Sequence, residues 1–349
     1  MLKALTFDVE ERAQAHRREA GPGTSPASRK SRFWPASATS QRAWALASPV
    51  VALAVALACL VIPLANGVVM AKDEAPVKGF EDLDPKNFDR STVIDNPWMP
   101  LKPGTRFTYK GTNIEDDGTP VPHQVVITIT DLTKVISGIR SVVSWDLDYS
   151  DGELVEAENA FYAQDNDGTV WRLGEYPEEY EDGKFGRAPA WLHGSEGAVA
   201  GIEMRASPQP GTPSYSQGWA PAVNFSDRGQ VDQTGQKICV PVKCYDDVLV
   251  IAEVSGEEKD AQQLKHFARR VGNILVTWRG KGEKTKETLQ LVSVEQLDVV
   301  ALAKARAGAL KLEKSAYDRS KTIYAHTLPA EHPAAAKSDK PTTPKEAQR

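Results

Sequence analysis

The chain has 349 residues, of which 26% are charged and 41% hydrophobic, and its formal net charge is −5 at pH 7. This length would allow two domains. Lysine and arginine are mixed with acidic residues along the chain, which argues against a nucleic-acid-binding surface.

The first 71 residues predict export. Residues 1–42 contain few apolar side chains and are predicted to be disordered, either as a cytoplasmic segment or as an over-long n-region of a signal sequence. Residues 43–71 carry no charge and follow several basic residues, so we expect the chain beyond them to leave the cytoplasm. Small residues at 69–71, or alternatively at 65–67, favour a cleaved signal peptide, whereas the long preceding segment favours an uncleaved membrane anchor. Both interpretations stay open.

Residues 78–294 are dominated by alternation of apolar and polar side chains. Phe107 and Tyr109 alternate with polar neighbours, as do Trp145 and Leu147. Such alternation predicts strands with one dry and one wet face, and repeated Asp-Gly pairs such as Asp151-Gly152 predict tight hairpins between them. The sequence therefore predicts one mainly β domain, an antiparallel meander.

Helical periodicity appears only near the end of the chain. Residues 295–324 place Ala305, Ala309, Leu312 and Ala316 near one face, which predicts a C-terminal amphipathic helix on the sheet or along its rim. Residues 325–349 are rich in Pro, Ala and Lys and predict a disordered tail.

The stretch "IDNPWMPLKPGTRFTYKG", residues 94–111, permits two interpretations. Pro97, Pro100 and Pro103 have the period of a polyproline II helix, which could be displayed to a partner. Trp98 lies between two prolines, however, and Gly104 leads straight into a strand. Because proline cannot donate a ladder hydrogen bond, we favour an extended lead-in to the strand, pinned by Trp98.

This stretch, together with "YAQDNDGTVWRLGE" and "VPVKCYDDVLVIAE", resembles uncharacterised secreted bacterial β-proteins with a "DNPYFPLKPGT … YAQDxDGxVW … VPAGxFDDVLV" pattern. The resemblance covers residues 80–294 and implies one secreted all-β domain without a catalytic assignment. The strand plan is more distantly similar to the half-barrel lipoprotein carriers of the bacterial envelope. That likeness implies a strongly curved meander of the open-barrel or half-barrel type.

Cys239 and Cys244 are the only cysteines after the apolar segment. Across a hairpin tip they could reach disulfide distance, and export would place them in an oxidising compartment. A metal site would need two more ligands, and no histidine is near in sequence. We therefore predict a disulfide that acts as a structural staple.

Other polar motifs have simpler explanations than chemistry. "AQDNDGTV", residues 163–170, resembles part of a calcium loop, but its first and last ligands are missing, so we expect a hairpin turn. Asp146 and Asp148 share a strand face and could do acid–base work, although we expect them to meet water. The histidines of the predicted β domain, His123, His193 and His266, match no catalytic motif, and neither does Ser195 of "HGSEG". We predict no catalytic residue, no metal and no cofactor.

Aromatic side chains remain as the candidate ligand-facing residues; they are Phe107, Tyr109, Trp145, Trp171 and Trp278. They could form a packed core or line a cavity for an acyl chain. The leading hypothesis is an exported non-enzymatic domain that binds an apolar ligand, either a lipid or an acyl chain, or a cell-envelope partner. The alternative is a structural or interaction module tethered to the membrane through residues 43–71. A hydrolase with an unidentified site is third.

Overall fold

The computed structural model describes residues 79–114, 117–256, 260–284 and 286–332. The predictions for residues 1–42, for the apolar segment 43–71 and for the tail beyond residue 332 lie outside these residues. Within the described ranges, no helix combines the length and the apolar character needed to cross a membrane.

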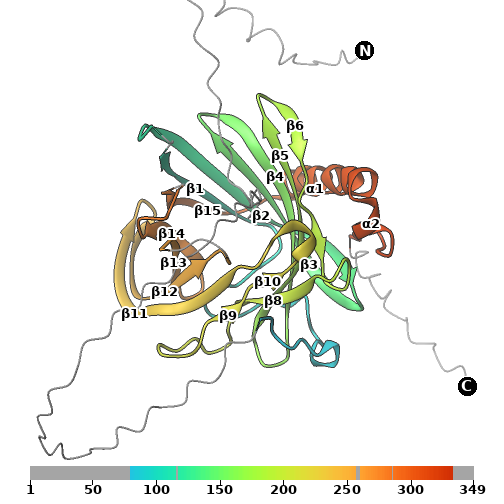
Figure 1. Ribbon diagram of the computed structural model, residues 1–349, viewed down its shortest axis with the longest axis horizontal. Helices are drawn as coiled ribbons and strands as arrows, with labels where there is room; N and C mark the ends of the chain where they lie inside the picture. The colour runs from blue at the N-terminus through green and yellow to red at the C-terminus, as the bar shows by residue number, and fades with distance from the viewer. Residues whose placement is uncertain (1–78, 115–116, 257–259, 285, 333–349) are drawn as a thin grey trace, which may run out of the picture. The chain divides into compact units, whose positions relative to one another are not determined.

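The strands form one large antiparallel sheet of fifteen strands (Figure 1). Their bounds are β1 Thr105–Ile114, β2 Pro120–Ile136, β3 Ile139–Ser150, β4 Glu153–Gln164, β5 Val170–Glu181, β6 Lys184–Arg187, β7 Trp191–Leu192, β8 Val199–Met204, β9 Tyr215–Ser216, β10 Gly218–Trp219, β11 Arg228–Val240, β12 Lys243–Val254, β13 Gln262–Ala268, β14 Gly272–Arg279 and β15 Thr288–Gln296. The helices are η3 Pro85–Asn87, η4 Pro221–Val223, α1 Val299–Arg319 and α2 Lys321–Tyr324.

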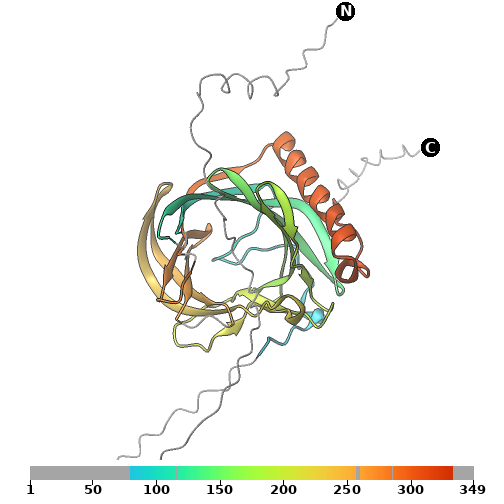
Figure 2. The same cartoon turned by 45° about the horizontal axis from the view of Figure 1, so that its top comes forward.

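Most strands pair with their neighbours in sequence, as a meander requires. The order is β10-β8-β5-β4-β3-β2-β1-β15-β14-β13-β12-β11-β9, with β6 and β7 paired to β5 beside this path. The sheet curls strongly (Figure 2), and its terminal strands β9 and β10 are separated only by Gln217. No ladder joins these two strands within the described residues, so the sheet is not closed. The predicted mainly β, antiparallel, open meander is confirmed.

Helix α1 covers the outer, convex face of β2–β4 (Figure 2). Asp298 caps it by accepting a hydrogen bond from the Ala301 amide at 2.8 Å. Small residues on its buried side let it approach closely: a Cβ atom at Gly308 would lie 2.5 Å from the Trp145 ring. The predicted amphipathic helix is thus present, packed on the sheet rather than on its rim.

A buried lysine anchors this helix. Lys134 of β2 has no exposed surface, and its Nζ donates to Glu313 Oε1 at 2.8 Å and to the Leu328 carbonyl at 2.7 Å. Residues 325–332, predicted to begin a disordered tail, follow the same anchor. The Glu331 amide donates to the Thr133 carbonyl at 2.7 Å, and the Thr133 amide donates to the Glu331 carbonyl at 2.8 Å. Backbone hydrogen bonds, rather than a side-chain pattern visible in the sequence, connect this segment to β2.

The lead-in interpretation of residues 94–104 is confirmed. Trp98 is only 6% exposed, and the Arg269 guanidinium lies 4.0 Å from the centre of its ring. The Arg270 amide donates to the Pro97 carbonyl, and the Gly104 amide to that of Ile129, both at 2.7 Å. The three prolines help line a groove of about 430 Å³ formed by residues 92–97, residues 100–103 and Arg270.

Candidate functional site

The inner face of the sheet, opposite the face that carries α1, is the candidate site. Its apolar part comes mainly from β1, β2 and β12–β15, and the lead-in residues Ile94, Trp98 and Leu101 pack into the same buried cluster. Its members include Phe107, Tyr109, Ile129, Leu249, Phe267, Ile274, Val276, Leu289 and Leu291. Val125 and Ile127 of β2 pack against this cluster but stay half-buried. Apolar surface is therefore still accessible on the inner face.

Three of the five predicted ligand-facing aromatics lie on this face. Phe107 and Tyr109 are buried in the inner cluster, and the Tyr109 hydroxyl donates to the Asn273 carbonyl at 2.9 Å. Trp278 follows Ile274 and Val276 at strand spacing, so it shares their face. It is 38% exposed. Of the three, Trp278 retains the most surface for a ligand.

The other two aromatics, Trp145 and Trp171, pack in the cluster on the opposite face of the sheet. Trp145 packs against the outer cluster beneath α1. Trp171 is buried in that cluster, where its ring meets Phe88 edge-on at 6.4 Å. The reason is that the outer face of these strands is also buried, partly beneath α1, so an aromatic side chain there does not identify the inner face.

Acidic side chains line the inner face of β3–β5 and β8. Because Trp145 and Leu147 face α1, the alternate residues Asp146 and Asp148 face inward, where both side chains are half-buried. On β4, Glu156 and Glu158 lie in alternation with Ala160 and Tyr162 of the inner cluster and share their face. The complete set is Asp146, Asp148, Glu156, Glu158, Glu175, Glu179 and Glu203.

Two basic residues hold some of these carboxylates. Arg172 of β5 donates from Nε to Glu203 Oε2 at 2.9 Å and from Nη1 to Glu175 Oε2 at 2.8 Å. On β13, Lys265 Nζ lies 2.6 Å from Glu253 Oε2. Both cations therefore already have carboxylate partners.

His123 forms ion pairs with Asp148, one of the inner carboxylates, and with Glu287. Its Nε2 lies 2.5 Å from Asp148 Oδ1, and its Nδ1 lies 2.9 Å from Asn113 Oδ1 and 3.1 Å from Glu287 Oε1. Burial alone would lower the pKa of His123, but the hydrogen bonds to Asp148 and Glu287 outweigh it and raise that pKa to about 10. His123 is therefore a charged imidazolium at neutral pH, with no free nitrogen to act as a base.

Three inner carboxyls are poorly compensated. Burial, opposed only in part by the Ser144 hydroxyl and by Arg172, raises the pKa of Asp146 to about 7. Burial and neighbouring carboxylates raise the pKa values of Glu156 and Glu158 well above their usual range. All three groups therefore keep their protons to higher pH than ordinary carboxyls do, and a protonated carboxyl can donate as well as accept hydrogen bonds.

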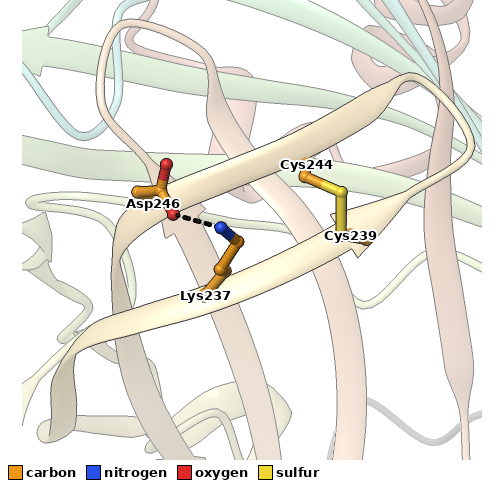
Figure 3. The surroundings of a disulfide bond; sticks show 4 residues. All are labelled: Lys237, Cys239, Cys244 and Asp246. Carbon is orange, nitrogen blue, oxygen red and sulfur yellow. Dashed lines mark ion pairs between the residues drawn. A yellow bond between two sulfur atoms is a disulfide. The ribbon is translucent and has the colours of Figure 1, made fainter.

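The predicted disulfide is present at the hairpin between β11 and β12 (Figure 3). Cys239 and Cys244 face each other in register, with their Cα atoms 3.9 Å apart. Beside them, Lys237 Nζ and Asp246 Oδ1 form an exposed ion pair at 3.3 Å. The pair staples the hairpin, as the sequence predicted.

The partial calcium motif is a turn between β4 and β5. Asp165 Oδ1 accepts from the amides of Asp167 and Thr169, and Oδ2 accepts from Trp171 Nε1 at 2.8 Å. These bonds account for both of its oxygens. In the described ranges, no group of His, Cys, Asp and Glu side chains is arranged to hold a metal ion.

The remaining candidates also have structural partners. Ser195 Oγ donates to the Ile323 carbonyl at 3.3 Å. His193 Nδ1 accepts from the Ala200 amide at 3.1 Å, and His266 Nδ1 lies 3.1 Å from the Leu275 carbonyl. None of these contacts pairs a nucleophile with a base.

No family model and no curated protein sequence matches this chain. Two solved structures show distant similarity. One, from Bacteroides fragilis, is provisionally described as an exported protein with a YmcC-like fold; it is 11% identical, with a TM-score of 0.34 over 57% of this chain and 98% of that one. The other, from Parabacteroides distasonis, is provisionally described as a lipoprotein; it is 12% identical, with a TM-score of 0.32 over 58% of this chain and 100% of that one. Likenesses this distant carry no functional argument.

Proposed function

We propose that this chain is an exported, non-enzymatic domain whose inner sheet face binds an apolar ligand, a lipid or an acyl chain. The observation that carries the proposal is the accessible apolar surface of Val125, Ile127 and Trp278 on that face. Concave apolar surfaces with a few polar groups are typical of small-ligand sites. Export is supported by the uncharged segment 43–71 and the basic residues before it.

A non-enzymatic role is supported by the state of the titratable groups. His123 is held as a cation between two carboxylates, and the Ser195 hydroxyl bonds to a backbone carbonyl. Neither side chain is arranged for nucleophilic catalysis, which needs a nucleophile within hydrogen-bond reach of its base.

Native mass spectrometry of the full chain, purified from its own host, tests the proposal. We expect a co-purifying lipid, and we expect a pyrene-labelled fatty acid or fatty alcohol to bind. Ile127→Gln should weaken binding because it places an amide on the apolar inner face. Leu310→Gln, on the exposed side of α1, is the matched control and should bind normally. The proposal would be refuted if no lipid co-purified and no probe bound. It would also be refuted if Ile127→Gln and Leu310→Gln weakened probe binding equally.

A further inference from the structure

The inner carboxyls form facing rows across three strands. Asp146 lies opposite Glu158, and Asp148 lies opposite Glu156, in the register of β3 and β4. Glu156 also lies opposite Glu179 of β5. Like charges directly opposite each other on one sheet face are destabilising. The fold therefore places acidic groups where ionised carboxylates oppose one another.

The cations near these rows are paired with other carboxylates, and two of those carboxylates, Asp148 and Glu179, belong to the rows themselves. His123 of β2 holds Asp148, Arg172 of β5 holds Glu175 and Glu203, Arg187 of β6 holds Glu179, and Lys265 of β13 holds Glu253 of β12. The remaining titratable side chains that influence the rows are Tyr109 of β1 and Tyr162 of β4. Asp146 accepts a bond from Ser144 Oγ at 2.6 Å. Within the described residues, neither Glu156 nor Glu158 has a hydrogen-bond or ion-pair partner, so protons are what remains to neutralise them.

We propose, on the basis of the function proposed above, that ligand binding is coupled to proton uptake: the apolar ligand occupies the inner face while Asp146, Glu156 and Glu158 are protonated, and their ionisation expels it.

The physical reason is desolvation. These side chains are only half-buried, so water reaches them while the inner face is empty. An apolar ligand would remove that water, and an ionised carboxylate that lacks both water and a cation is strongly disfavoured. A neutral carboxyl can instead share its proton with the oxygen opposite. Binding therefore favours the protonated form, and by linkage protonation favours binding.

The pKa of Asp146, at about 7, places the transition near neutral pH. If only the protonated form binds, affinity should fall about tenfold between about pH 6 and about pH 8 through this group alone. Ionisation of Glu156 and Glu158 would add to the fall as pH rises, because their pKa values are also raised well above the ordinary range.

The experiment measures binding of a pyrene-labelled fatty alcohol to the full chain between about pH 5 and about pH 9. The alcohol carries no charge in this range, so any pH dependence belongs to the protein. The variant Asp146→Asn/Glu156→Gln/Glu158→Gln imitates the protonated side chains in shape and charge. It should keep the low-pH affinity at every pH. Glu153→Gln/Asp318→Asn removes two exposed carboxylates as the control and should behave like the wild type.

Calorimetry in two buffers of different ionisation enthalpy gives a second measurement that needs no variant. Near neutral pH, the wild type should take up protons when the alcohol binds. Binding without proton uptake, or a fall in affinity that persists in the amide variant, would overturn the coupling and leave the proposed function intact. Absence of binding at every pH would overturn both.

Discussion

Replacing Lys134 by methionine should test what holds α1 and the following segment to the sheet. The substitution keeps a long unbranched side chain but removes the ammonium group. Glu313 then loses its cation while staying 4% exposed. The contacts of Lys134 with the Leu328 carbonyl and the Tyr317 hydroxyl are lost as well.

The expected cost follows from the burial of the pair. Removing one partner of a buried ion pair typically costs about 3–5 kcal/mol, because the other charge remains desolvated. Glu313 keeps the Ala330 amide, which lies 3.0 Å from each of its oxygens. We therefore expect the free energy of unfolding to fall by about 3 kcal/mol, the low end of that range. In Lys134→Met/Glu313→Gln no charge stays buried, and the loss should shrink to about 1 kcal/mol.

Urea unfolding of the full chain, followed by tryptophan fluorescence, gives the required numbers. The midpoint should move at an unchanged m-value, since the same surface is exposed on unfolding. Two results would refute the reasoning. One is a loss below about 1 kcal/mol in the single variant. The other is a loss of stability in the double variant equal to the losses of Lys134→Met and Glu313→Gln added together, because additive losses would mean that the two side chains do not interact.

Three further predictions concern other parts of the sheet. Cys239→Ser/Cys244→Ser should fold, and its free energy of unfolding should fall by no more than about 2 kcal/mol, since the closed loop is short. Thermal melting measures this loss, and reduced wild-type protein, the control, should lose the same amount. The charge of His123 should contribute stability that is fully present below its unfolded pKa of about 6.5 and is lost as pH rises toward its folded pKa of about 10. In urea unfolding, the stability of His123→Gln should therefore depend less on pH across that window than the stability of the wild type. An equal pH dependence in the two proteins would contradict the raised pKa. Gly308→Ala should push α1 away from Trp145, because the new Cβ atom would sit 2.5 Å from the ring; a melting temperature equal to that of the wild type would show that the contact yields freely.

Much of the fold was predictable because its signals are local. Alternation in β1 and β3, Asp-Gly turns such as Asp151-Gly152 and the spacing of Cys239 and Cys244 depend on residues a few positions apart. Strand geometry turns such patterns into faces, and turn residues with positive φ, such as Gly152, set the hairpins. These features are recognisable without any knowledge of distant contacts.

The same patterns could not tell which face of a strand is the inner one. On β3, Trp145 and Leu147 form an apolar face, and the natural expectation sends Asp146 and Asp148 to water. In the structure α1 covers the apolar face from outside, so the acidic face turns inward. Alternation identifies two faces, but only the position of a helix more than 150 residues later in the chain decides which of them is enclosed.

The candidate site shows the same division between local and distant information. The sequence by itself determined a mainly β chain with a stapled hairpin, a pinned lead-in and a terminal helix, since each is encoded within a short window. Only the tertiary structure brought His123 to Asp148 and Glu287, and placed Glu156 between Asp148 and Glu179. Register and sheet curvature create these contacts, and the resulting desolvation and charge opposition depend on distances in space, which residue order does not contain.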